Sequence, residues 1–239
     1  MNRVTKGTRL RAGTRLRAGT RLLAAALTAL AATAALAGEA SAQRYRFTFN
    51  GPGIEGSVRL TYGPATDARY ANAYQVTGVR GTFTDTNNGL NIVNAPIGSL
   101  VPLARTAPEP ANLLAPADFS LYPVAGVEGG GLHYTNLFWP GGSPQTATDY
   151  PFAGGFLDIY GLVFDIGDGR VVNLWSDGNL EGGPITYGAA VATANGTLDY
   201  VFAGVTASVV TPEPGSLALL GVGSVGLVGV LARRRRAAA

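Results

Sequence analysis

The sequence predicts an all-β body, an antiparallel β-sandwich of jelly-roll or lectin-like type, with an N-terminal signal helix before it and a C-terminal transmembrane helix after it. Three observations support this prediction. Short segments in which apolar and polar residues alternate recur through residues 43–210, and none has a sustained helical period. Glycine makes up 25 of those 168 residues, which is typical of many tight turns. Uncharged apolar segments beside arginines flank this body on both sides.

Residues 1–42 have the three parts of a secretory signal peptide. Residues 1–21 contain seven basic residues and no acid, and the apolar stretch "LLAAALTALAATAALA" follows at 22–37. Ala40, Ser41 and Ala42 then give the small-x-small pattern that signal peptidase accepts, so we expect cleavage after Ala42. The head has no adjacent arginine pair, which favours general secretion of an unfolded chain. The alternative is an alanine-rich amphipathic helix that the mature protein keeps.

The body reads as strands and turns and is long enough for one domain, residues 43–210. In "RYRFTFN", Tyr45, Phe47 and Phe49 alternate with polar residues, which is the pattern of a half-buried strand. Asp168-Gly169 lies between two runs rich in valine, isoleucine and leucine and predicts a tight hairpin. The proline-rich residues 107–116 predict a loop. Ten strands are expected, at residues 44–50, 57–62, 74–84, 90–93, 99–103, 131–139, 155–165, 170–175, 185–192 and 198–209.

A second apolar segment precedes a cluster of arginines near residue 239. Residues 217–232 carry no charge and would span about 24 Å as a helix. With the two preceding residues, the segment 215–232 approaches the lower limit for crossing a bilayer. Arg233, Arg234, Arg235 and Arg236 would remain on the cytoplasmic side, which places the body outside the inner membrane. The alternative is a buried core helix. The four glycines within residues 217–232 and the four arginines after them disfavour that alternative.

Pro212-Glu213-Pro214, the apolar helix and the arginine cluster come in an order that resembles the PEP-CTERM sorting signal. Proline fixes φ and lacks an N–H donor, so this tripeptide stays extended at the membrane face. The resemblance makes residues 211–239 a sorting segment. It implies recognition by an exosortase, removal of the tail, and delivery of the body to the cell surface or extracellular matrix. A second Pro-Glu-Pro, at residues 108–110, lacks the helix and the arginines and predicts only a loop.

Much of the body is also similar to uncharacterised PEP-CTERM proteins, over residues 71–92 and 136–178. This second resemblance implies no activity, cofactor or catalytic residue.

Charge and composition exclude several functions. The body contains seven arginines and thirteen acids, so its net charge of −6 disfavours nucleic acid as a partner. The chain has no cysteine, which excludes disulfides and thiolate metal sites. His133 is the only histidine and alternates with Leu132 and Tyr134, which predicts a position on a strand surface. We therefore predict no catalytic residue and no cofactor, and we assign no metal ligand; the turn aspartates leave calcium open as an alternative.

The acids and aromatic residues of the body favour carbohydrate as the ligand class. Asp158, Asp165, Asp168, Asp177 and Glu181 gather in one region, but Asp165 and Asp168 flank a turn, where aspartate normally bonds to the backbone. Aromatic rings that bind sugars are the better candidates. The aromatic residues of this region also include Phe138, Tyr150 and Tyr160. From this group we select Trp139 and Trp175 as the sugar-contact residues. We expect Trp139 to be exposed, because it lies at a strand end.

The sequence therefore predicts a non-enzymatic exported protein of the cell surface or matrix, associated with exopolysaccharide. Its expected partners are signal peptidase, an exosortase and, until the tail is removed, the inner membrane. The alternative is a secreted carbohydrate-active hydrolase that uses a pair of carboxylates.

Overall fold

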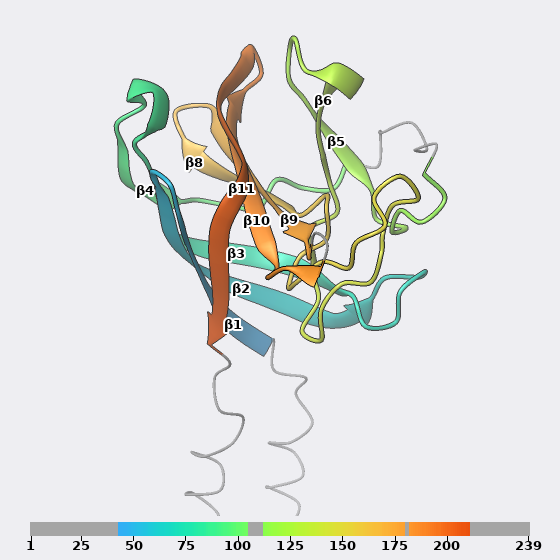
Figure 1. The fold of residues 1–239 in the computed structure, drawn as a ribbon. Coiled ribbons are helices and arrows are strands. Elements are labelled where there is room, and N and C mark those ends of the chain that lie inside the picture. The colour runs from blue at the N-terminus through green and yellow to red at the C-terminus, as the bar shows by residue number, and fades with distance from the viewer. Residues whose placement is uncertain (1–42, 105–111, 180–181, 211–239) are drawn as a thin grey trace, which may run out of the picture. The chain divides into compact units, whose positions relative to one another are not determined.

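A computed structural model describes residues 43–104, 112–179 and 182–210 of the chain (Figure 1). Within these residues, no helix has the length and apolar character needed to cross a membrane. Several predictions fall outside the described residues: the signal helix, the Pro-Glu-Pro at 108–110, the transmembrane helix, Ala40, Ala42, Glu181, Pro212, Glu213, Pro214, Arg233, Arg234, Arg235 and Arg236.

The described residues form eleven strands and two short 3₁₀ turns, which confirms the all-β prediction. The strands are β1 (Gln43–Gly51), β2 (Ile54–Thr66), β3 (Tyr74–Asp85), β4 (Ile92–Ile97), β5 (Ser120–Pro123), β6 (Gly131–Tyr134), β7 (Leu137–Phe138), β8 (Leu162–Gly167), β9 (Arg170–Gly178), β10 (Thr186–Thr193) and β11 (Gly196–Val210). The turns are η1 (Asn87–Gly89) and η2 (Glu128–Gly130).

One large antiparallel sheet contains most of these strands, in the order β4-β3-β2-β1-β11-β10-β9-β8, and β7 pairs with β3. The residues after β4 continue along β8 and bring the two edges of the sheet together. Gly98 N donates to Asp165 O over 3.0 Å, and Val101 N donates to Val163 O over 2.8 Å. The sheet is therefore nearly barrel-shaped, while β5 and β6 form a separate two-stranded sheet.

The long strand β11 belongs to both halves of the large sheet. Its residues up to Val205 pair with β10, and those from Thr206 onwards pair with β1. Gly204 has φ of 97° at this corner, a conformation that glycine adopts without strain. Because one sheet bends continuously through β11, the structure confirms an antiparallel fold but does not confirm the narrower jelly-roll or lectin-like sandwich.

The core lies between the two halves of this sheet. Phe47 and Phe83, on the first four strands, are completely buried. Their rings contact Tyr187 on β10 and Phe164 on β8, with centroids 5.7 and 6.4 Å apart. A smaller apolar cluster, which includes Trp175, covers the outer face of β9 and β10 beneath β5 and β6. Strand β9 is consequently buried on both faces.

The predicted turns agree better with the structure than some strand boundaries do. Asp168 and Gly169 have φ of 55° and 69°, so the predicted tight hairpin between β8 and β9 is confirmed. The strand expected at 131–139 is broken between β6 and β7 at Asn136, which has φ of 52°. Its side chain accepts from Val163 N and donates to Val101 O, which anchors the break to both closing segments.

Candidate functional site

The main candidate site is a hollow of about 350 Å³ between β6 and the outer face of β9, β10 and β11. We call it the aromatic hollow. Its polar and small lining residues include Asn173, Ser176, Asp177 and Ala190. Its rings come from β6, β9, β11 and the loop before β8, and they are His133, Tyr150, Tyr160, Trp175, Tyr200 and Phe202.

A glycine on the middle strand allows a row of rings to lie across the sheet. Gly188 on β10 pairs with Trp175 on β9, and a Cβ atom at Gly188 would come within 2.2 Å of the indole ring. Trp175 therefore lies over β10 and stacks on Tyr200 of β11, with centroids 5.5 Å apart and planes at 29°. Tyr200 in turn stacks on Phe202, at 6.4 Å and 25°. Three aromatic rings thus form one platform.

The exposed part of this platform differs from the sequence prediction. Tyr200 and Phe202, which the sequence reasoning missed, are 57% and 49% exposed, whereas Trp175 is 8% exposed and forms the inner end of the stack. The expectation that Trp139 is exposed is wrong, because this side chain is completely buried and its Nε1 donates to Asp158. Phe138 is also a core residue.

One carboxyl group lies at the edge of the platform. Asp177 Oδ1 accepts a hydrogen bond of 2.8 Å from Trp175 Nε1, which fixes the indole, while Oδ2 has no hydrogen-bond partner among the described residues. Burial raises the pKa of Asp177 to about 6. On the opposite wall, His133 is half-buried on β6 and stacks on Phe119, and burial lowers its pKa. Its place on a strand confirms that part of the prediction.

The other predicted acids do not converge with Asp177 on the hollow. Asp158 is completely buried and accepts from Gly161 N, Tyr160 N, Thr135 Oγ1 and Trp139 Nε1. Burial raises the pKa of Asp158 to about 6, although these hydrogen bonds favour its charged form.

The two acids at the β8–β9 turn also have local roles. Asp165 Oδ1 accepts from Gly167 N, and Asp168 lies 3.9 Å from Arg170. The described residues contain no group of three or more histidine, aspartate or glutamate side chains that could hold a metal ion.

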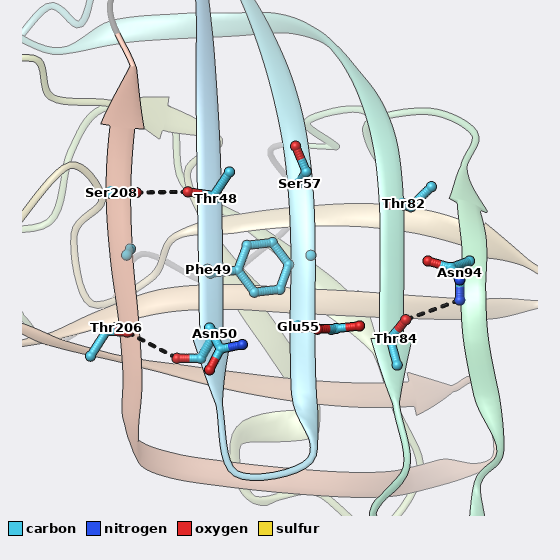
Figure 2. A pocket seen from close by; sticks show the side chains of 12 residues that line it. Thr48, Phe49, Asn50, Glu55, Ser57, Thr82, Thr84, Asn94, Thr206 and Ser208 are labelled. Carbon is cyan, nitrogen blue, oxygen red and sulfur yellow. Dashed lines mark hydrogen bonds between the residues drawn. The ribbon is translucent and has the colours of Figure 1, made fainter.

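A second surface, the polar face, covers the outer side of the first strands (Figure 2). It encloses a hollow of about 600 Å³ and is rich in hydroxyl and amide groups. Thr48 Oγ1 and Ser208 Oγ are 2.7 Å apart, and Thr206 Oγ1 donates to Asn50 O, so β1 and β11 are joined by side chains as well as by backbone. Two cross-strand rows make up this face: Ser208, Thr48, Ser57 and Thr82, then Thr206, Asn50, Glu55 and Thr84.

Buried carboxyls predict an unusual pH dependence of stability. Burial, together with the neighbouring Asp199, raises the pKa of Asp85 to about 6, despite a hydrogen bond from Asn87 N that lowers it. The pKa of Asp158 and of Asp177 is also raised. A carboxyl whose folded pKa exceeds its unfolded value takes up a proton on folding, so the folded state gains stability as pH falls from above 6 towards 4.

We therefore expect a higher Tm at pH 5 than at pH 7.5 in scanning calorimetry. The difference should be at least about 3 °C, the shift that roughly 1 kcal/mol produces in a domain of this size. Asp85→Asn should raise Tm at pH 7.5 and reduce the difference between the two pH values. A Tm that falls on acidification would contradict the prediction.

The comparisons with known proteins concern the segment beyond the described body. Residues 210–236 match the family model of the PEP-CTERM protein-sorting motif. No curated protein and no solved structure matches the chain. The motif implies an exported, membrane-anchored precursor whose processing partner is an exosortase. The chain is therefore a protein with a PEP-CTERM sorting motif, joined at residue 210 to an antiparallel all-β body.

Proposed function

We propose that this exosortase substrate is a non-enzymatic protein of the cell surface or extracellular matrix whose body binds exopolysaccharide in the aromatic hollow. The observation that carries the proposal is the platform of three stacked rings, of which Tyr200 and Phe202 are half-exposed. Flat aromatic faces bind the apolar C–H faces of sugar rings, and a few polar groups beside them orient the ligand. Asp177 and Asn173 supply those groups.

Contacts within the fold hold the inner ring of the platform, which favours binding because little side-chain entropy remains to be lost there. Trp175 is held by its hydrogen bond to Asp177, and its indole ring packs directly on Gly188. Tyr150 donates to the backbone oxygen of Asp177 and fixes the adjacent wall. The inner end of the platform and the adjacent wall are therefore preorganised by the fold.

The alternative, a carbohydrate-active hydrolase, needs two carboxyl groups on opposite sides of the scissile bond. Among the described residues that line the aromatic hollow, Asp177 carries the only carboxyl group. One of its oxygens is already bound to Trp175. Asp158, the other acid of this region with a raised pKa, is enclosed in the core and bonded to four groups. This distribution supports binding rather than hydrolysis.

The test is retention of the full-length chain on immobilised exopolysaccharide from the cells that make the protein. We expect Tyr200→Ala with Phe202→Ala to lower retention about thirtyfold, because each ring contributes on the order of 1 kcal/mol and about 1.4 kcal/mol is a factor of ten. Val93→Ala is the matched control, since Val93 is also exposed, at 58%, but lies on β4.

Equal retention of wild type and the double variant would reject the aromatic hollow as the binding site. Release of shortened saccharides from the resin, lost in Asp177→Asn, would favour the hydrolase instead.

A further inference from the structure

Four exposed arginines gather on one face of the large sheet. Arg46 on β1 pairs across strands with Arg59 on β2, and Arg59 pairs with Arg80 on β3. Arg44 lies two residues away from Arg46 on the same face of β1. Neighbouring strands are about 4.8 Å apart, so the three paired residues span roughly 10 Å. We call these four residues the arginine row.

This arrangement is electrostatically unfavourable for the body alone. Like charges directly opposite on neighbouring strands repel one another. Among the described residues, no acid lies within ion-pair distance of the row, whereas Arg170 pairs with Asp168. Glu55, on the same outer face, lies four residues from Arg59. That is about 13 Å along β2, longer than the screening distance of about 8 Å at physiological salt.

The row surrounds a concave surface of its own. A hollow of about 350 Å³ is lined by Arg44, Arg59 and Arg80 together with Thr61 and Gly78. Thr61 pairs with both Arg44 and Gly78 across the strands, so the glycine leaves room between the guanidinium groups and the sheet. Three cations around one hollow in a body of net charge −6 favour an anionic ligand.

The neighbouring polar face indicates what kind of anion fits. Thr48, Ser57 and Thr82 lie two residues from Arg46, Arg59 and Arg80 on the same face and form the adjacent cross-strand row (Figure 2). A linear ligand that lies across the strands would contact cations along one side and hydroxyl groups along the other. An acidic polysaccharide presents both matching groups, carboxylate or sulfate and sugar hydroxyl.

We propose that the arginine row binds the acidic groups of a matrix polysaccharide, at a site separate from the aromatic hollow. The inference rests on the proposed function in taking the partner to be a polysaccharide. Each guanidinium would donate paired hydrogen bonds to a carboxylate or sulfate. A lipid surface is the competing partner, because Arg46 also pairs with Val210, the residue before the sorting segment.

The test is fluorescence anisotropy with the full-length chain in non-ionic detergent and three labelled probes: oligogalacturonate, a neutral dextran oligomer and a short-chain phosphatidylglycerol. We expect Arg59→Gln with Arg80→Gln to raise the Kd for oligogalacturonate about tenfold and to leave dextran unaffected. Arg170→Gln removes one arginine charge away from the row and should leave every Kd unchanged. The double variant should have a Tm at least as high as that of the wild type, since it removes a repulsion.

An unchanged Kd for oligogalacturonate in the double variant would overturn the inference. So would a loss confined to phosphatidylglycerol, which would assign the row to a lipid surface. If exopolysaccharide is still retained through Tyr200 and Phe202 in either case, the proposed function stands and only this inference fails. If the wild type binds neither oligogalacturonate nor exopolysaccharide, both fail.

Discussion

Replacing Pro212, Glu213 and Pro214 by alanine is expected to abolish processing of the exported protein. The match at residues 210–236 implies that an exosortase handles this segment. Proline fixes φ and lacks an N–H donor, which disfavours helix at this tripeptide, whereas alanine favours helix. We expect the wild type to be released with an intact mass that ends near residue 212. The variant should keep its arginines and stay in the membrane fraction.

The chain contains its own control for this experiment. Alanine replacement of the second Pro-Glu-Pro, at residues 108–110, makes the same chemical change at a tripeptide that no apolar segment and arginine cluster follow. It should leave mass and fraction as in the wild type. If wild type and both variants all keep the tail in the membrane, the segment is a plain anchor and the sorting role is refuted.

Asp158→Ala is expected to cause the largest loss of stability within the body. The carboxyl group accepts from two backbone amides, Tyr160 N and Gly161 N, and from the side chains of Thr135 and Trp139. Removing it leaves buried donors without an acceptor, which should lower the free energy of unfolding by about 4 kcal/mol. In urea denaturation followed by far-ultraviolet circular dichroism, the midpoint should fall accordingly, and Tm should fall on the order of 10 °C.

Two further variants show whether the network causes this effect. Asp158→Asn keeps one acceptor oxygen and should lose roughly half as much stability. Asp165→Ala removes a half-buried carboxyl group whose hydrogen-bond partner among the described residues is Gly167 N, and should lose less than about 1 kcal/mol. Equal losses of unfolding free energy for Asp158→Ala and Asp165→Ala would show that the buried hydrogen bonds of Asp158 contribute no more to stability than the bond at the turn.

Alternation of apolar and polar residues was sufficient to predict most of the large sheet. In β1, Phe47 and Phe49 face the core and Arg44 and Arg46 face solvent, as the period of two requires. The pattern gives no information on which strands become neighbours. The pairing of β1 with β11 and the closure of β4 on β8 depend on contacts far apart in the sequence. Strand β5 was missed because only four residues pair, next to the proline-rich segment.

The candidate site was harder to predict because an aromatic residue in a strand is compatible with either face. Tyr200 and Phe202 alternate with Val201 in β11, so they were bound to share a face. All three are apolar, and the pattern therefore gave no sign of which face was exposed. Trp139 looked exposed because Pro140 and two glycines follow it. Its burial depends on Asp158, nineteen residues later, which no local pattern shows.

The pairing of the first strand with the last has a consequence for the order of events during export. Thr48 and Ser208, whose hydroxyl groups lie 2.7 Å apart, are 160 residues apart in the chain. The large sheet cannot be completed until β11 has emerged and joined β1, and contacts of such long range form slowly. A chain that crosses the membrane from its N-terminus thus remains without its closing strand until residue 210 has passed. For a chain exported in the unfolded state, the topology alone would place the final folding step after the passage of residue 210.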